Sequence, residues 1–359
     1  MRRTGIWIAV LLLSSCTKEG DTIYKPDPNE EQASTTPLVT VIYGDNSLGD
    51  RSYCDMIYEG VERTAQELGL RTMQLSPQST EEGLRYLELM MRQMEAAQDS
   101  VRRLFVVTSP VYDEYLRTNS NRLAKNANAD LLYLETRTPL LGKGSTFFMP
   151  YYGAMFEAGA MMPALGERVM LIGANRQEQA IVDAIQGFTD GWNADMTSVI
   201  GRTKKYLATT YIDETGEGGY EIADSTAMRL IHQWNDDEIS NIVPICGGAF
   251  NTFWRMNEVE MRGMFIVGVD KEYRHPRSHL SVVKRIDQAV VRCIRQWLSS
   301  EGMPKHQSLG LASGFTEVIR TYSDHSELYP IETLEELNEE KLKEIHETAL
   351  RKEEEYEKK

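Results

Sequence analysis

The strongest constraint on the fold of this chain is the alternation of short apolar segments with amphipathic segments after Pro37. The run 38–43 has the composition of a buried strand, and in 53–68 the apolar side chains recur with the spacing of one helix face. Many further pairs of the same kind follow. Repeated strand–helix alternation predicts an α/β fold, in which doubly wound parallel sheets are covered by helices on both faces.

The expected elements are too numerous for one sheet. We expect strands at 38–43, 70–75, 103–108, 131–135, 146–149, 168–172, 204–211, 241–245, 264–268 and 308–313. We expect helices at 53–68, 79–97, 111–125, 151–163, 176–194, 223–235, 249–258 and 286–300. Since a single open sheet rarely holds so many strands, we expect two lobes that face each other across a cleft. Lobes of this kind often close around a ligand by a hinge motion.

The two lobes are expected to share the chain unevenly. We place lobe 1 at 37–150 together with about 270–330, and lobe 2 at 151–269. The remaining segment, 331–359, is rich in both charges and has a narrow apolar stripe, which predicts an appended charged helix. The simpler interpretation is a solvated helix that lies on the protein, and the alternative is a helix that binds a partner. Small residues in 153–160 predict a helix that packs closely against a neighbour.

The first residues have the pattern of an export leader. Arg2 and Arg3 precede a short apolar run, 6–13, which is too short to span a membrane. Leu13-Ser14-Ser15-Cys16 then matches the bacterial lipobox, in which the cysteine is lipidated and becomes the new N-terminus. The alternative is an ordinary secretory signal with a chance cysteine. We expect a signal peptide at 1–15 and a lipidated Cys16 at the start of a polar tether, 16–36.

The predicted lipid would anchor the protein in the bacterial cell envelope, because several acyl chains on one residue give stable membrane attachment. The pattern does not distinguish the inner from the outer membrane. The formal net charge of −15 argues against nucleic-acid backbones as partners. Besides the lipidated Cys16, three cysteines remain, and an odd number requires at least one unpaired thiol; Cys246 and Cys293 are expected in the core. The sequence contains no GxSxG, HExxH or Walker A motif, and it predicts no metal and no cofactor.

One candidate ligand site begins at the loop 43–53, between the first expected strand and the first expected helix. Ligands of open α/β sheets bind at the carboxyl ends of strands, where helix N-termini present free N–H groups. Asp50 lies where it can cap the helix and hold the loop in shape, or line the site. Tyr53 is the residue of this loop that we expect to contact the ligand.

Three later stretches also follow strand or strand-like segments. In Cys246-Gly247-Gly248-Ala249-Phe250-Asn251, Gly248 allows close approach to the backbone and Phe250 offers a ring. Asp270 can accept hydrogen bonds from ligand hydroxyls, and Lys284 can donate to the same hydroxyls while it balances the charge. Two rings could enclose a flat ligand, each contact worth roughly 0.5–1.5 kcal/mol beyond area burial. Any one of these stretches alone is equally well explained as a strand-end turn.

Several of these stretches resemble segments of the basic membrane protein family, also called PnrA-like lipoproteins. The likeness spans most of 38–315. Its clearest segments are Leu48-Gly49-Asp50-Arg51-Ser52-Tyr53, Tyr58-Glu59-Gly60, Phe188-Thr189-Asp190-Gly191-Trp192, Gly268-Val269-Asp270 and Ser281-Val282-Val283-Lys284-Arg285-Ile286-Asp287. They are similar to the family patterns I-D-D-K-S-F, W/Y-E-G, F-x-x-G-Y, G-V-D-x-D-Q and S-x-V-K-R-V-D. The resemblance implies the fold of a type I periplasmic solute-binding protein.

The resemblance also implies roles for individual residues. Tyr53 would stack on a nucleobase, and Asp270 with Lys284 would hold the sugar hydroxyls. Cys54 stands where the family has an asparagine, so an amide that could bind a base edge is missing. The sugar end of the family site is therefore kept better than the base end, and Cys54 is the position where we expect the ligand preference of this chain to differ.

The sequence supports three hypotheses about function. The first is a lipid-anchored, non-enzymatic solute-binding protein that captures a nucleoside-like molecule or polyol between its lobes and delivers it to an ABC importer. The second is a non-transport lipoprotein of the same fold that senses a ligand or scaffolds a partner. The third is an enzyme such as a nucleoside hydrolase, which would need clustered carboxylates with calcium; no run such as DxDxxxDD is present.

Overall fold

The computed structural model describes residues 35–45, 47–194, 206–216, 218–260, 263–321, 335 and 337–358. The predicted signal peptide, Cys16 and nearly all of the predicted tether lie outside the described residues. Among the described residues, no helix has the length and apolar character needed to cross a membrane.

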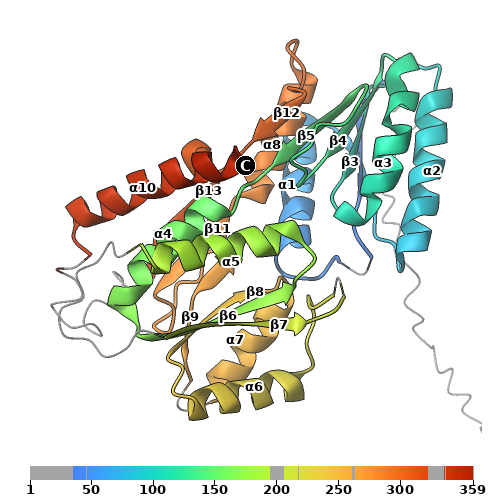
Figure 1. The fold of residues 1–359 in the computed structure, drawn as a ribbon. Helices are drawn as coiled ribbons and strands as arrows, with labels where there is room; N and C mark the ends of the chain where they lie inside the picture. Colours follow the sequence, from blue (N-terminus) through green and yellow to red (C-terminus); the bar gives the residue numbers. More distant parts are fainter. Residues whose placement is uncertain are drawn as a thin grey trace, which may run out of the picture.

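The first part of the chain, together with the later segment 286–308, forms a six-stranded, all-parallel sheet and the helices that cover it (Figure 1). Its strands, in spatial order, are β12 (His306–Ser308), β5 (Gly144–Phe148), β4 (Ala129–Tyr133), β3 (Arg103–Val107), β1 (Leu38–Ile42) and β2 (Arg71–Leu75). Its helices are α1 (Tyr53–Leu68), α2 (Thr80–Ala96), α3 (Asp113–Asn119) and α8 (Ile286–Leu298). Side chains alternate along β1: Val39 and Val41 face α1 and α8, whereas Ile42 faces α2 and α3. The sheet is therefore covered on both faces, as the sequence predicts.

The second part of the chain builds two smaller sheets. One is parallel and has the order β7 (Tyr206–Asp213), β6 (Arg168–Asn175), β8 (Asn241–Ile245) and β9 (Phe265–Ile266). The other has the order β10 (Gly268–Asp270), β11 (Leu280–Lys284) and β13 (Thr316–Arg320), with β13 antiparallel. The helices of this part are α4 (Tyr152–Leu165), α5 (Gln179–Trp192), α6 (Asp224–Asp236), α7 (Ala249–Val259) and α10 (Glu339–Glu357).

The chain passes between two hydrophobic cores three times. Met149 packs in the core of the six-stranded sheet, and Tyr151 already packs in the second core. The chain returns to the first core between Val282 and Ile286, and it leaves again between Leu309 and Leu311. We call these three places the crossings. By their positions, β10 and β11 belong to the second core, and so does β13. The chain therefore returns to the first core after β11, and not near residue 270 as the sequence predicts.

Helix α1 illustrates how closely pattern and structure agree. It spans the predicted residues, 53–68, and buries Ile57, Val61 and Ala65 along one face. Gly69 ends the helix with a φ of 66°, a left-handed conformation that glycine adopts without a Cβ clash. The periodic apolar face together with this terminal glycine is why the prediction succeeded here.

Other predicted elements differ from the structure. The expected helix 111–125 is interrupted: a 3-10 turn, Pro110–Tyr112, precedes α3, and a second, Ser120–Lys125, follows it. Side-chain bonds accompany the interruption, because Asn119 donates to the Tyr115 carbonyl and Ser120 to the Leu141 carbonyl. The expected strand 308–313 is β12 followed by a 3-10 turn, Leu311–Ser313. Strands β11 and β13 were not expected.

The small residues of α4 allow the close packing that the sequence predicts. A Cβ atom on Gly159 would lie 2.1 Å from the carbonyl oxygen of Phe188 in α5. On the facing helix, a Cβ atom on Gly191 would lie 2.0 Å from the carbonyl oxygen of Phe156. The two helices therefore approach each other at backbone distance. Helix α4 is buried on nearly every side, which explains its almost uniformly apolar sequence without a membrane.

The C-terminal helix α10 is more deeply packed than a solvated helix on the surface. Ile345 and Ala349 are fully buried against the second core, and Glu353 is 5% exposed. The two carboxylate oxygens of Glu353 accept hydrogen bonds from the backbone N–H groups of Gly153, at 3.0 Å, and Leu311, at 2.9 Å. These donors belong to helix N-termini, where N–H groups have no intrahelical partner. The carboxylate therefore stabilises two helix starts at once.

Glu353 should give the fold a distinct pH dependence. Burial raises the pKa of this carboxyl from 4.5 to about 7, although the two N–H groups favour its charged form. The folded state therefore binds this proton more tightly than the unfolded chain does. As the pH rises from 4.5, the unfolded pKa, to about 7, the folded pKa, the free energy of unfolding should fall by roughly 3 kcal/mol. Glu353→Gln should flatten that slope. Urea unfolding at a series of pH values measures it, and an unchanged slope in the variant would contradict the assignment.

Candidate functional site

The candidate site lies where the carboxyl ends of strands from both cores meet. The first core contributes the loop after β1 and the residues after β4 and β5. The second core contributes the segments after β8, β10 and β11. The two sides are in direct contact: the Asn251 side chain donates to the Asp50 carbonyl oxygen at 2.9 Å, and the Lys271 ammonium donates to the Arg51 carbonyl. This is the edge at which open α/β sheets bind ligands.

Asp50 caps α1. One oxygen of its carboxylate accepts hydrogen bonds from the N–H groups of Ser52, at 2.7 Å, and Asp55, at 3.2 Å. The other accepts from the N–H of Cys54 at 3.0 Å. The side chain thus satisfies donors at the start of the helix and fixes the loop that carries Tyr53. This is the capping role that the sequence suggests for Asp50, and its backbone carbonyl additionally contacts the second core.

A buried ion pair joins the two cores at the site. The Lys284 ammonium at the end of β11 lies 3.1 Å from a carboxylate oxygen of Glu135, which follows β4. The side chains are 7% and 12% exposed, respectively. Burial raises the pKa of Glu135, and Lys284 opposes that shift. The positive charge of Lys284 therefore favours the ionised form of a buried carboxylate, next to the crossing at 282–286.

Asp270 lies on the other side of the site. Its carboxylate oxygens lie 3.2 Å from the Ser52 hydroxyl and 3.3 Å from the Tyr151 hydroxyl. The Tyr151 hydroxyl is also 2.9 Å from the Val282 carbonyl, to which it can donate a shorter bond. Burial raises the pKa of Asp270, and the charge of Lys284 lowers it. Among the described residues, these two long contacts are the side-chain hydrogen bonds to its oxygens, so the carboxylate can accept further hydrogen bonds from a ligand.

Two tyrosines flank the lysine. The ammonium of Lys284 lies 5.9 Å from the ring centroid of Tyr53 and 5.2 Å from that of Tyr151, within cation–π range. The Tyr53 hydroxyl is buried and makes no hydrogen bond to another described residue. Burial raises the pKa of both phenols well above the ordinary value, so both are neutral donors at physiological pH. The Tyr53 hydroxyl is thus a buried polar group of the site with no hydrogen-bond partner in the described part of the chain.

Backbone strain is concentrated at the same place. Four non-glycine residues of the described chain have positive φ, and three of them belong to the site: Arg51 at 52°, Glu135 at 57° and Asp270 at 68°. Each left-handed residue costs on the order of 1–3 kcal/mol and persists only where the surrounding structure enforces it. Such strain is typical of functional sites, because it fixes side chains in positions that relaxed backbone would not give.

Gly248, Phe250 and Cys54 have other surroundings. A Cβ atom on Gly248 would lie 3.1 Å from the Tyr220 carbonyl and 3.8 Å from the Asp50 Cβ, so the glycine lies at the junction of the two sides. The Phe250 ring is 3% exposed and packs in the second core, 4.4 Å from the Tyr273 ring. Cys54 is 7% exposed and points from the first turn of α1 into the first core. The cysteines Cys54, Cys246 and Cys293 are all buried and free, as expected for the last two.

The structure thus brings Tyr53, Asp270 and Lys284 together and places Asp50 behind them as a cap. The sequence reasoning missed Glu135 and Tyr151, which complete the group. Glu135 is the last residue of the predicted strand 131–135, and Tyr151 lies two residues after the predicted strand 146–149, so the rule of strand carboxyl ends could have found both. Glu178, which follows β6 and accepts a hydrogen bond from the Tyr220 hydroxyl, satisfies the same rule.

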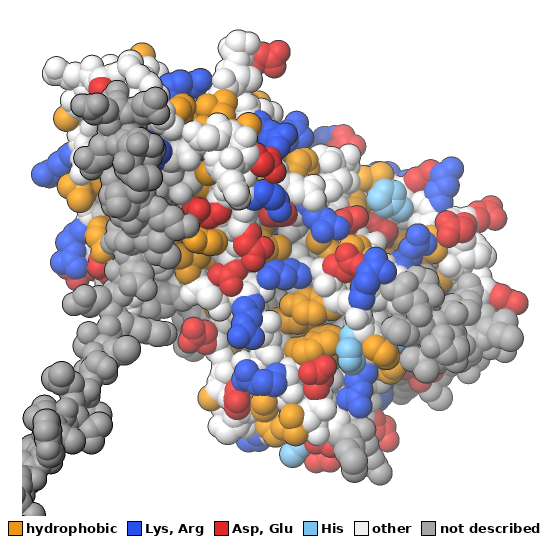
Figure 2. Space-filling model, turned by 180° about the vertical axis from the view of Figure 1, so that it is seen from behind, with side chains coloured by type: hydrophobic (Ala, Val, Ile, Leu, Met, Phe, Trp, Pro, Cys, Tyr) orange, Lys and Arg blue, Asp and Glu red, His pale blue; other side chains and the backbone are white. Residues whose placement is uncertain are grey.

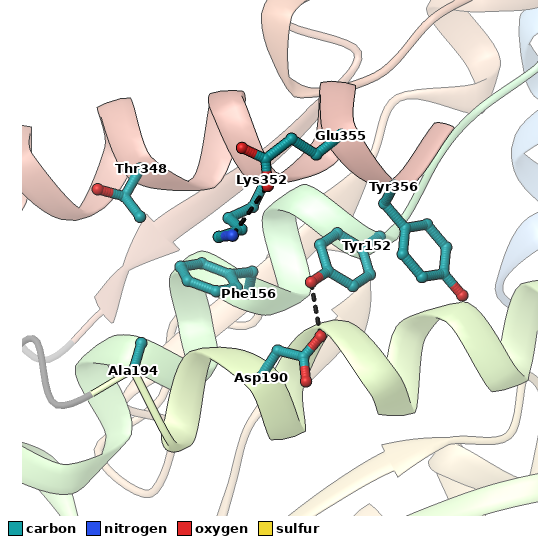
Figure 3. Close-up of a pocket in the computed structure, with 8 residues that line it drawn as sticks. All are labelled: Tyr152, Phe156, Asp190, Ala194, Thr348, Lys352, Glu355 and Tyr356. Carbon is teal, nitrogen blue, oxygen red and sulfur yellow. Dashed lines mark hydrogen bonds and ion pairs between the residues drawn. The ribbon is translucent and has the colours of Figure 1, made fainter. Parts of the chain in front are cut away.

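A separate cavity of about 450 Å³ lies away from this site, between α10 and the helices α4 and α5 (Figure 3). Its lining residues are Tyr152, Phe156, Asp190, Ala194, Thr348, Lys352, Glu355 and Tyr356. None of the predicted site residues belongs to it. Within the described residues, no group of three His, Cys, Asp or Glu side chains is placed to hold a metal ion. On the face shown in Figure 2, basic and acidic side chains are interspersed.

No family model and no curated protein matches the chain in sequence. Solved structures do match. An ABC transporter solute-binding protein from Aeropyrum pernix K1 has a TM-score of 0.64 and 19% identity over 90% of each chain. A transcriptional activator of the comK gene from Bacillus halodurans has a TM-score of 0.60 and 15% identity over 83% of this chain and 94% of that one.

A periplasmic solute-binding protein of an ABC transporter from Actinobacillus succinogenes 130z, solved with bound D-allose, also matches. Its TM-score is 0.57, with 11% identity over 82% of this chain and all of that one. At these identities the likeness shows the fold, which is the two-lobed α/β fold of type I periplasmic binding proteins. The resemblance to the basic membrane protein family stays a prediction.

The ion pair can be tested through stability. Lys284→Met leaves the Glu135 carboxylate buried without its partner, and breaking a buried pair in this way costs about 3–5 kcal/mol. The double variant Glu135→Gln, Lys284→Met should recover part of this loss, because no charge is then left unpaired. Urea unfolding of both single variants and the double variant measures the coupling.

Lys343→Met is a suitable control for this cycle, because the Lys343 side chain on α10 is 77% exposed. Its loss should change the free energy of unfolding by less than about 0.5 kcal/mol. Strictly additive effects at Glu135 and Lys284 would show that the pair contributes nothing, contrary to the prediction.

Proposed function

We propose that this protein is a solute-binding lipoprotein that captures a nucleoside-like molecule or another polyol between its two lobes. The observation that carries the proposal is the row Glu135–Lys284–Asp270, which lies at strand ends of both lobes beside two tyrosines. Carboxylates accept hydrogen bonds from vicinal hydroxyls, and a lysine donates to the same groups. Such a row therefore suits a ligand with several hydroxyl groups.

The tyrosines add an apolar contribution. A ring system next to Tyr53 would gain stacking of roughly 0.5–1.5 kcal/mol beyond area burial, and a ligand acceptor could take the hydrogen bond of the buried Tyr53 hydroxyl. Binding needs no covalent chemistry. The direct contacts between Asp50 and Asn251 and between Ser52 and Asp270 connect the lobes across the site, so its two sides already touch in this structure.

The cellular role rests on the leader and the fold together. The lipobox ending at Cys16 would anchor the protein in the bacterial cell envelope, and an ABC importer would receive the ligand. Proteins named as ABC transporter solute-binding components share this fold, which supports the proposal. A membrane permease is thus the partner we propose.

The second candidate is a non-transport lipoprotein that senses a ligand or scaffolds a partner. The fold is also found in a protein named as a transcriptional activator, so it is not confined to transport. Deleting 331–359 would be a poor test of a scaffold, because Ile345 and Ala349 are part of the core. Charge changes on the exposed face of α10 would test partner binding without removing that packing.

A panel of nucleosides, pentoses and hexoses tests the main proposal. Full-length protein in detergent should show a higher melting temperature with at least one of them, since ligand at 100 times its Kd raises the free energy of unfolding by about 2.7 kcal/mol. Asp270→Ala should abolish that shift, because the hydroxyl acceptor is lost.

Asp224→Ala is the matched control, since the Asp224 side chain on α6 is 59% exposed and far from the row in sequence. It should respond to the ligand as the unaltered protein does. The proposal fails if the whole panel leaves the melting temperature unchanged, and the role of Asp270 fails if its variant keeps the full shift.

A further inference from the structure

The C-terminal helix α10 is bonded to the chain at two of the three crossings, where the chain passes from one core to the other. Glu353 accepts hydrogen bonds from Gly153, two residues after the first crossing ends, and from Leu311, where the third crossing ends. We propose that α10 is a strap that fixes the angle between the two lobes, with Glu353 as its anchor at the crossings. The proposal concerns the fold itself and holds whatever the ligand is.

The anchor has a space built for it. A Cβ atom on Gly153 would lie 2.4 Å from one oxygen of Glu353, and a Cβ atom on Gly310 would lie 2.4 Å from the other. Gly310 is equally close to Pro150 of the first crossing, so two crossings and the carboxylate are packed together. Any larger residue at Gly153 or Gly310 would displace the side chain. The contact therefore depends on residues from three distant parts of the sequence.

The last turn of α10 touches both lobes. The Tyr356 ring stacks on the Tyr152 ring at 4.1 Å, and its hydroxyl donates to Asp183 of α5 at 2.7 Å, both in the second lobe (Figure 3 shows the two rings). Towards the first lobe, Glu357 accepts a hydrogen bond from the Ser308 hydroxyl of β12 at 2.9 Å. In Figure 1 the end of α10 accordingly reaches the edge of the six-stranded sheet near β12 and β5.

Arg137 connects the lobes at the same end of the strap. It follows β4 in the first lobe and forms an ion pair with Asp183, which is 1% exposed in the second lobe. Its guanidinium also lies 5.6 Å from the Tyr356 ring centroid and 4.7 Å from that of Phe148. The Asp183 carboxylate thus forms an ion pair with Arg137 and accepts a hydrogen bond from the Tyr356 hydroxyl. A rotation of one lobe against the other about the crossings must strain or break this set of contacts.

Hinge motion in two-lobed proteins is absorbed by a few residues in the connecting segments. Here a carboxylate holds two of the three connecting segments, and the helix that carries it is bonded to both lobes. The strap therefore adds a free-energy cost to any change of the lobe angle. Loss of Glu353 should release the crossings first, and loss of the Tyr356 hydroxyl should weaken the bridge at the end of the helix.

The test measures the distance between the lobes. Nitroxide labels are attached at Gln93→Cys on α2 and Gln233→Cys on α6, which are exposed positions in opposite lobes. The native cysteines Cys54, Cys246 and Cys293 are buried and therefore shielded from the label. Pulsed electron–electron double resonance on the full-length chain in detergent should give a narrow distribution of the distance between the two labels. Glu353→Gln should broaden it and shift it to longer distances, because an amide offers a single acceptor oxygen for two N–H donors.

Two further variants make the result decisive. Tyr356→Phe keeps the ring but loses the bond to Asp183, so it should shift the distribution in the same direction by less. Glu354→Ala removes a neighbouring side chain that is 70% exposed, and it should leave the distribution unchanged. Protein without the two introduced cysteines measures background labelling.

The proposal is overturned if folded Glu353→Gln and Tyr356→Phe proteins give the unaltered distribution, or if Glu354→Ala shifts it as much as they do. Should Glu353→Gln not fold, as judged by loss of a cooperative melting transition, Tyr356→Phe alone decides. A shift in Tyr356→Phe then supports the strap, and an unchanged distribution refutes it.

Discussion

The buried charge of Lys284 is the interaction on which the arrangement of the site depends. Its ammonium is paired with Glu135 of the first lobe, and its charge also opposes the burial of Asp270 in the second. Without this cation, nothing would offset the burial of the two carboxylates, because burial disfavours the charged form. One lysine at the end of β11 thus allows acceptors from both lobes to share a site, and it does so beside a crossing of the chain.

The packing of the two cores offsets the unfavourable free energy of the strained and buried groups at the site. Left-handed backbone at Arg51, Glu135 and Asp270 is unfavourable by itself, and so is a buried tyrosine hydroxyl without a partner. The sheets on both sides, each covered by helices, hold these residues in place. In the second lobe, glycines let α4 and α5 approach at backbone distance, and α10 closes over α4. Rigid packing next to the crossings is what allows this strain to persist at the site beside them.

The sequence was most informative where local and global preferences agree. Helix α1 has a periodic apolar face and a terminal glycine, so its bounds could be predicted, and Asp50 could be identified as its cap. Prediction failed where tertiary contacts decide. Strands β11 and β13 are short and pair with partners that are distant in sequence, and the helix expected at 111–125 is interrupted where its side chains bond to other segments. The return to the first lobe after β11 could be located only from the membership of the cores.

The sequence by itself determined the α/β alternation and the helices with one apolar face, and it pointed to three residues of the candidate site, because these follow from periodicity and from the position of polar residues after strands. Only the tertiary structure decided that Glu135 and Tyr151 join them, that Phe250 and Cys54 lie in cores, and that Glu353 of the tail reaches two crossings. The physical reason is the same in each case. A hydrogen bond or ion pair between residues far apart in the chain leaves no periodic trace in the sequence, whereas burial of one face of a helix or strand does.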